Sequence, residues 1–576
     1  MAARRRVPAP VDGSFRWRPC RVDRRRTGAA ILIVTGLIAA GASAASAHVG
    51  TSNAYFEGAA GPYRVRVIVR TPGVIPGLAQ ASVRVHGGES VERVTLRPLR
   101  SDVGLEGAPP PDVAGPVPGE AGLFSGELWL MTAGSYSVEV GVAGAAGEGT
   151  VFVPVLALAE RRLAMNPAFG AGLVAAALFL FVGAVTIVGA AVRESVLEPG
   201  RDPDAGRRRR GRFAMAAFTL ILGAVLGGGW IWWDAVDAAY QSRIYRPWNT
   251  AAAVTEAGGA RILTLAIDDP DWRAIEGLPD AGLLPDHGKL MHMFLVRAGD
   301  LAAFAHIHPV RDGYDSFSVP LPPLPAGEYR IYADIVLENG FAPTLVDTVS
   351  VGPPGSAAFG ASPGAGGSVA AGGDPQSADH PSADPDPDDS WATLRPRGAA
   401  RAGSYPLASG RTVRWERDGR IAADKEVTLR FSVTEPDGSP SALAPYMGML
   451  SHAAVFRDDG SVFVHLHPAG SINLTAQMRF AETEGAGAGP EPDGGNDRAV
   501  RAGGQAARAV DRGHDGTSPG GALDAPVQAA SPRSNTVTFP FVFPESGAYR
   551  IFVQVKIGAE VETAAFDVEV REALPS

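Results

Sequence analysis

The chain is poor in cysteine: its 576 residues include one, Cys20, which precedes an apolar run near the N-terminus. Three arginines at 24–26 lead into that run, which spans 28–41, and Ala-Ser-Ala follows it at 45–47. This order is typical of an export signal with a small-residue cleavage site, which we place at 1–47. Cleavage would remove Cys20, so the mature chain is expected to have no disulfide, no thiolate zinc site and no iron–sulfur cluster.

Positive charge is also scarce. The formal net charge is −9, with 52 Lys and Arg against 61 Asp and Glu, and basic residues concentrate only at the N-terminus and in a short segment at 193–212. Nucleic-acid binding needs clustered Lys and Arg, so no nucleic-acid partner is expected. The sequence also shows no acid/base carboxylate pair at a fixed spacing and no nucleophile motif, so we do not expect an enzyme.

Long apolar runs are present in the first half of the chain. Residues 168–192 and 213–233 carry no charge, and each is long enough to span a bilayer, which takes roughly 20 residues. Between them, 193–212 contains seven arginines, which indicates a cytoplasmic loop, and tryptophans at 230, 232 and 233 mark the other interface. We therefore predict a two-helix hairpin in a bacterial cytoplasmic membrane, with 48–167 and 234–576 on the extracytoplasmic side. The alternative is a pair of buried core helices.

Outside these runs, hydrophobicity alternates with period two, as at 63–69 and 136–142, which indicates half-buried strands. A Gly-x-Tyr motif opens a strand near the end of each of three segments, at 133–136, 326–329 and 546–549, and a tyrosine packing the corner of a sandwich would explain it. The predicted fold is mostly β, with three immunoglobulin-like β-sandwiches plus the transmembrane hairpin. The sandwiches are placed at 48–160, 250–352 and 401–571. Two stretches rich in small and polar residues are read as disordered, a linker at 353–400 and an insertion at 482–535.

Histidines carry the chemical information. Six of the eleven form two matching sets that both end in His-x-His-Pro: His292, His306 and His308, and then His452, His465 and His467. A three-residue loop in the first hairpin would place His292 opposite His306, and a two-residue turn in the second would place His452 opposite His465. Period two then puts the last histidine of each set on the same face. A slip of one residue would scatter either cluster.

Three clustered imidazoles can bind a metal ion and leave a fourth position open. Imidazole suits copper and zinc, and Cu(II) binds most tightly in the divalent series. Methionines at 291, 293, 447 and 449 lie near the clusters and would favour Cu(I), although strand parity turns 291 and 293 away. Copper is therefore the first choice of cofactor and zinc the second. The alternative is that the histidines only pack and form hydrogen bonds.

His48 would become the first residue of the mature chain. An N-terminal histidine chelates Cu(II) through its amine and ring nitrogen together, so His48 is a further candidate ligand. The alternative is an ordinary signal-processing boundary.

The Gly-x-Tyr openings and the His…His-x-His-Pro hairpins resemble YtkA-like and FixH-like domains, which are small β-sandwiches of bacterial envelope proteins, often linked to metal. The first segment, with His48-Val-Gly and the run from Gly61 to Val67, more loosely resembles CopC-like copper carriers. The resemblance implies a membrane-anchored extracytoplasmic metal-binding protein for buffering, delivery or sensing. The alternative is a structural or interaction module of an envelope protein complex without metal. Neither apolar run contains the His, Asp or Glu of an ion pathway, which argues against transport through this chain alone.

Overall fold

The computed structural model describes residues 53–87, 91–198, 200–257, 260–274, 282–353, 386–398, 403–417, 419–485 and 534–573. The predicted export signal at 1–47 and His48 lie outside these residues, as does most of the predicted insertion. Within them, six antiparallel sheets pack in pairs around three hydrophobic cores, and two long helices follow the first pair. The expectation of a mostly β chain with two long apolar helices is confirmed.

The first domain is a pair of sheets with strand orders β1-β2-β3-β7-β6 and β5-β4-β8-β9. Alternate residues of β2, such as Val65, Val67 and Val69, are fully buried between the sheets, as period two requires. The strands are β1 Ala54–Ala60, β2 Tyr63–Arg70, β3 Gly77–His86, β4 Val91–Arg100, β5 Asp112–Val113, β6 Gly115–Pro116, β7 Leu123–Leu130, β8 Gly134–Gly144 and β9 Gly147–Ala157, with a short 3-10 turn η2 at Leu105–Gly107.

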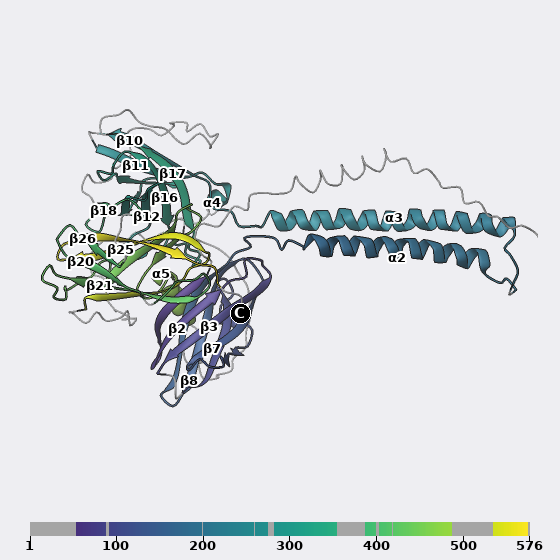
Figure 1. The fold of residues 1–576 in the computed structure, drawn as a ribbon, viewed down its shortest axis with the longest axis horizontal. Helices are drawn as coiled ribbons and strands as arrows, with labels where there is room; N and C mark the ends of the chain where they lie inside the picture. The colour runs from purple at the N-terminus through teal and green to yellow at the C-terminus, as the bar shows by residue number, and fades with distance from the viewer. Residues whose placement is uncertain are drawn as a thin grey trace, which may run out of the picture. The chain divides into compact units, whose positions relative to one another are not determined.

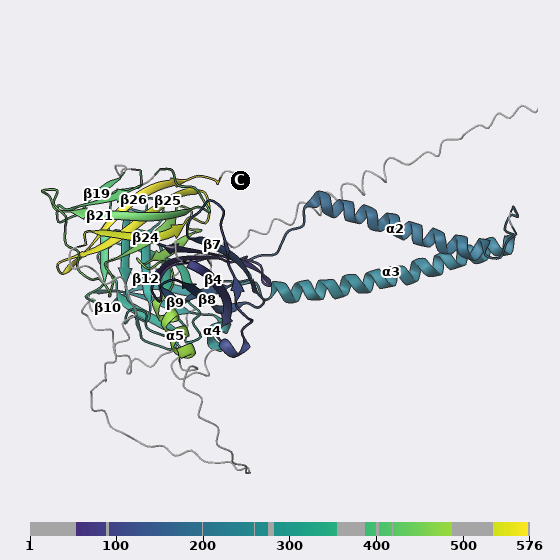
Figure 2. The ribbon, with the colours of Figure 1, turned by 90° about the horizontal axis from the view of Figure 1, so that it is seen from below.

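Two long helices follow, α2 (Pro167–Glu194) and α3 (Ala205–Gln241), and they lie side by side in both views (Figures 1 and 2). They are in contact at Gly189, where an added Cβ would lie 2.5 Å from the Met215 sulfur. Both are long and apolar enough to cross a membrane, and almost none of either apolar window is buried, which does not suit buried core helices.

The predicted loop at 193–212 is shorter in the structure than the sequence suggested. Helix α3 already begins at Ala205, so the arginine run at 207–210 lies in its first turns. The reason is a helix cap: the Asp204 carboxylate accepts a hydrogen bond from the Arg207 backbone N–H (2.7 Å). Arginine is a good helix former, so nothing in the run opposes the helix.

The second domain pairs the sheet β10-β11-β15-β14 with the sheet β17-β16-β12-β13-β18. Its strands and its one short helix are β10 Thr250–Ala257, β11 Ala260–Ile267, α4 Pro270–Ala274, β12 His292–Arg297, β13 Ala303–Ile307, β14 Val310–Arg311, β15 Ser316–Pro320, β16 Gly327–Asp334, β17 Thr344–Val351 and β18 Ser390–Thr393. Strand β18 lies inside the predicted disordered linker, so that prediction is wrong for 386–398. Trp391 and Leu394 give this segment apolar surface, and β18 pairs with β13, which places Ser390 beside His306.

The third domain pairs β19-β20-β21-β24 with β23-β22-β25-β26. Its elements are β19 Ser404–Pro406, β20 Thr412–Glu416, β21 Glu426–Thr434, β22 Ser451–Arg457, β23 Phe463–Leu466, α5 Leu474–Gly485, β24 Thr536–Val542, β25 Gly547–Ile557 and β26 Glu560–Val570. Helix α5 was not predicted, and it extends past residue 482, where the insertion was expected to begin. Its packing against β9 of the first domain gives it a partner that the local sequence does not reveal.

The Gly-x-Tyr motifs make the same local structure three times. The tyrosine hydroxyl bonds to the residue four positions earlier: Tyr329 donates to the Pro325 carbonyl (2.7 Å), Tyr549 donates to the Glu545 carbonyl (2.9 Å), and Tyr136 lies 3.0 Å from the Thr132 hydroxyl. This is the corner packing that the motif predicted.

The sheet containing β12 and the sheet containing β22 are buried on both faces. In β12, Met293 and Leu295 belong to the core of the second domain, whereas Phe294 and Val296 pack with residues of the third. Two stacked ring pairs join the domains, Phe304 on Phe552 (centroids 4.4 Å) and Tyr332 on Phe463 (4.7 Å). The inward-facing histidines of both domains therefore meet at one interface.

Candidate metal centre

Seven histidines from the second and third domains gather at this interface. Each is less than a tenth exposed, measured over the side chain for His287 and over the whole residue for the other six. They are His287, His292, His306, His308, His452, His465 and His467. The two predicted sets therefore form one cluster, with His287 as a further member. The remaining described histidine, His86, ends strand β3 of the first domain.

The predicted strand register was wrong by two residues, although the predicted faces were right. The observed pairs Met293↔Ile307 and Ala453↔Leu466 place His308, not His306, next to His292 across the strands, and likewise His467 next to His452. An even shift preserves side-chain parity, so each set stays on one face.

The register differs because both hairpin loops are longer than predicted. The Asp300 and Asp459 carboxylates each accept a hydrogen bond from the backbone N–H two residues on, at 3.0 Å and 2.9 Å. These Asx turns accommodate extra residues in each loop.

His292, His306 and His308 bring three ring nitrogens within 4.8 Å of one another, and we call this set the triad. His292 Nε2 donates to the Asp286 carbonyl (3.1 Å), so its Nδ1 carries a lone pair. His306 Nδ1 lies 2.9 Å from Gln554 Oε1, so its Nε2 carries a lone pair. The Gln554 amide nitrogen donates to the Ser390 hydroxyl.

The two lone-pair nitrogens of this arrangement, His292 Nδ1 and His306 Nε2, are 3.2 Å apart. Two lone pairs at this distance repel unless a cation lies between them. Zinc–imidazole bonds of about 2.0–2.1 Å in tetrahedral geometry separate neighbouring nitrogens by roughly 3.3 Å, close to the observed value. The spacing therefore suits two ligands of one metal ion.

His308 completes the triad from the end of β13. Its Nδ1 donates to the Asp389 carboxylate (2.9 Å), and its buried Nε2 has no hydrogen-bond partner among the described residues. A carboxylate behind an imidazole fixes the tautomer and makes the other nitrogen a better ligand. All three members of the triad thus present a lone pair and hold their other nitrogen in place.

A second set of ring nitrogens within 4.8 Å of one another comes from both domains: His287 with His452 and His467. The sequence had grouped His465 with the last two. In the structure the His465 ring lies 4.4 Å from His467 and 5.6 Å from both His292 and His306, between the two sets. Its Nδ1 is 3.5 Å from the Asp334 carboxylate.

Burial controls the charge of the cluster. Desolvation, with neighbouring histidines adding to it, lowers the pKa of four members well below 6.5: His292, His306, His452 and His467. Burial also lowers the pKa of His287, although Asp286 opposes this. These imidazoles are therefore neutral at neutral pH, which is the form that binds metal ions.

Sequence reasoning missed three residues of this centre. His287 lies outside both predicted sets, although it precedes His292 by only five residues. Asp389 lies in the Asp-rich segment taken as a linker, and a carboxylate run before Trp391 was the available signal. Gln554 is on β25, far along the chain, and no local pattern indicates it.

The methionines near the clusters lie among buried residues. Met291 and Met293 are fully buried in the core of the second domain, as strand parity predicted. Met447 occupies a turn equivalent to that of His287, with φ values of 49° and 51°, and each turn is closed by a β-bridge. The predicted ligand His48 lies outside the described residues.

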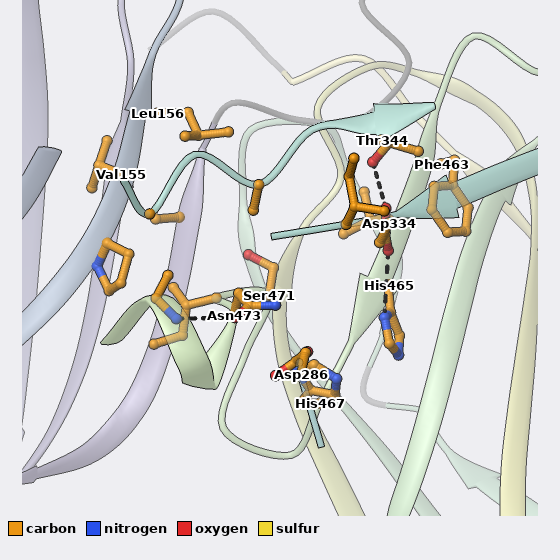
Figure 3. Close-up of a pocket in the computed structure, with 18 residues that line it drawn as sticks. Val155, Leu156, Asp286, Asp334, Thr344, Phe463, His465, His467, Ser471 and Asn473 are labelled. Carbon is orange, nitrogen blue, oxygen red and sulfur yellow. Dashed lines mark hydrogen bonds and ion pairs between the residues drawn. The ribbon is translucent and has the colours of Figure 1, made fainter. Parts of the chain in front are cut away.

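A cavity of about 140 Å³ opens beside the cluster and is lined by residues of all three domains (Figure 3). In Figure 3 the Asp334 carboxylate lies between Thr344 and His465, and dashed lines join it to both. Asp286 and His467 both line the cavity.

Residues 407–491 and 524–572, within the third domain, match a family model described as a domain of unknown function (DUF8832). No curated protein matches the chain. Among solved structures, it is similar to a tetra-tandem repeat in the extending region of a large adhesion protein (9% identity, 86% of this chain and 71% of that chain, TM-score 0.13). It is also similar to the FN1–FN3 domains of chicken CNTN1 (7% identity, 88% of this chain and 97% of that chain, TM-score 0.12). A third similar structure is an ICAM-5 D1–D4 ectodomain fragment (8% identity, 89% of this chain and 77% of that chain, TM-score 0.13). TM-scores this low carry no inference about function.

Proposed function

We propose that this chain is a membrane-anchored protein that binds a transition-metal ion at the triad, on the extracytoplasmic side of a bacterial cytoplasmic membrane. The observation that carries the proposal is the 3.2 Å approach of His292 Nδ1 to His306 Nε2, while the other nitrogen of each ring contacts an oxygen, the Asp286 carbonyl or Gln554 Oε1. Burial lowers the pKa of both rings, so a positively charged ring does not explain the approach at neutral pH.

The donor set restricts the metal. Three neutral imidazoles suit copper, zinc or nickel, whereas calcium and magnesium need oxygen ligands. Copper(II) is favoured because it binds such donors most tightly, and zinc is the second choice. The thioether argument for Cu(I) loses support, because Met291 and Met293 lie in the core of the second domain.

The architecture supports holding an ion more than moving one across the membrane. The triad is buried between β-domains, and the apolar runs at 168–192 and 213–233 contain no His, Asp or Glu. Buffering, delivery to a partner, or sensing all fit a protein that binds an ion in a fixed place. We propose no enzymatic activity. The alternative function, a structural module of an envelope complex, requires no bound ion.

Elemental analysis of the full chain tests the proposal. The protein would be purified in detergent, loaded with copper(II) or zinc(II) sulfate, dialysed and compared with His306→Ala and with His86→Ala, a histidine outside the cluster. We expect bound copper or zinc in the wild type and in His86→Ala, and loss of at least one ion in His306→Ala. Copper and zinc at background level in folded wild-type protein, as judged by circular dichroism, would refute it.

A further inference from the structure

The second set of histidines draws its members from two domains. His452 and His467 belong to the hairpin of the third domain, with ring centroids 5.1 Å apart. His287 belongs to a turn of the second domain, and its ring lies 6.1 Å from His452 and 5.2 Å from His467. Neither domain alone contains this set.

Four of the six ring nitrogens of this set are buried and have no hydrogen bond among the described residues. His452 is fully buried and His467 is 4% exposed. Among the described residues, both ring nitrogens of His452 and the Nε2 atoms of His467 and His287 have no hydrogen-bond partner. A buried, unpaired polar group costs about 1–3 kcal/mol. Three rings that each carry such a nitrogen, and that each bring one ring nitrogen within 4.8 Å of the others, indicate a missing electron-pair acceptor. The ligand that satisfies several imidazole lone pairs at once is a metal ion.

The surroundings of the set favour a cation that can exchange. The cavity of about 140 Å³ reaches His467 and His465 and carries two carboxylates, Asp286 and Asp334. Asp286 also connects the two sets, because its carboxylate lies 3.6 Å from His287 Nε2 and its carbonyl accepts from His292. Its negative charge favours a cation beside either set.

Residues of the first domain also line this cavity. The loop after His467 pairs with strand β1 through Glu57 N–H to the Ala469 carbonyl (2.7 Å) and Ser471 N–H to the Tyr55 carbonyl (2.9 Å). The loop that follows a histidine of the second set is thus held by the domain that leads directly into α2.

We propose that His287, His452 and His467 form a second metal-ion site, shared between the second and third domains and reaching the cavity at His467, while the triad forms the first. This inference rests on the proposed function and adds to it a second ion of the same class, copper(II) or zinc(II). The bound ion joins two domains that are otherwise held together by ring stacking and hydrogen bonds.

The test compares the same substitution at two equivalent turns of the full chain in detergent. His287→Asn removes the imidazole, and Met447→Asn is the matched control, because asparagine tolerates the positive φ of both positions. Each protein, together with His306→Ala, would be loaded with copper(II) sulfate, dialysed and examined by elemental analysis and electron paramagnetic resonance. We expect two ions with magnetically coupled spectra in the wild type and in Met447→Asn, and one uncoupled ion in His287→Asn.

Other outcomes separate the two proposals. One ion in the wild type, lost in His306→Ala and kept in His287→Asn, would leave the proposed function intact and overturn the second site. Two ions retained in His287→Asn, an ion lost equally in Met447→Asn, or two uncoupled ions in the wild type would also overturn it. No copper in folded wild type, and no zinc after loading with zinc(II) sulfate, would reject both proposals.

Discussion

The hairpins of the second and third domains share a sequence motif and a side-chain face, yet they hold their histidines differently. In the hairpin of the second domain each of the three imidazoles has one nitrogen held, by the Asp286 carbonyl, Gln554 or Asp389. In the third, His452 has no hydrogen bond at either nitrogen among the described residues, and His465 lies 3.5 Å from Asp334. The motif alone therefore places imidazoles together, and their hydrogen-bond partners decide which of them are preorganised as ligands.

The two domains also exchange partners across their interface. His306 of the second domain contacts Gln554 of the third, and His465 of the third contacts Asp334 of the second. The stacked pairs follow the same rule, with Phe304 on Phe552 and Tyr332 on Phe463. The two repeats thus face each other with near two-fold equivalence, and the differences between them lie in the polar partners.

The stacked rings at the interface predict equal losses of stability when either domain is altered. Phe304→Ala and Phe463→Ala each remove a fully buried ring that stacks across the interface, so each should lower the free energy of unfolding by about 3–5 kcal/mol. Urea denaturation of the metal-free protein, followed by fluorescence, measures both. A loss below 1 kcal/mol in either variant would contradict the packing between the two domains.

The carboxylates that contact the histidines predict unequal losses of metal affinity in the two domains. Asp389→Asn removes the carboxylate behind His308, and such changes weaken metal affinity by about 10–100-fold. Asp334→Asn alters a longer contact to a histidine outside the triad, so its effect on triad affinity should stay within about threefold of wild type. Competition with a chelator of known affinity measures both. Equal losses in the two variants would remove the distinction between the domains.

Acid should destabilise the metal-free cluster. The folded-state pKa of four histidines lies well below 6.5, so the unfolded chain binds more protons between that value and 6.5. Stability is then complete above pH 6.5 and falls as the pH drops, by up to about 1.4 kcal/mol per pH unit for each histidine. Denaturation midpoints at pH 7.5 and 5.5 test this, and His452→Gln should reduce the difference. A midpoint that does not change between these pH values would contradict it.

The smallest expected effect concerns the amide that orients His306. Gln554→Glu keeps an oxygen acceptor for His306 Nδ1, so we expect copper or zinc affinity to change by less than about tenfold. Gln554→Leu leaves His306 Nδ1 unpaired and should weaken metal binding more. Isothermal titration of both variants gives the comparison. Stronger binding in Gln554→Leu than in Gln554→Glu would contradict the assigned tautomer.

Local pattern predicted much of this arrangement. Period two placed the three histidines of each set on one face, the Gly-x-Tyr openings predicted the tyrosine corners, and the apolar runs predicted α2 and α3. The register failed by two residues because Asx turns at Asp300 and Asp459 lengthen both loops. The sequence could not predict that the two clusters meet, because their meeting depends on two sheets packing face to face. Asp389 and Gln554 approach their histidines from segments 81 and 248 residues away.

The central claim is that the buried histidines at this interface bind a transition-metal ion, first of all at the triad. X-ray absorption spectroscopy of the copper- or zinc-loaded full chain tests it most directly. We expect nitrogen scatterers at about 2.0–2.1 Å, with the outer-shell pattern of several imidazoles and no sulfur. A first shell with sulfur at about 2.3 Å, or with oxygen alone and no imidazole pattern, would contradict the claim.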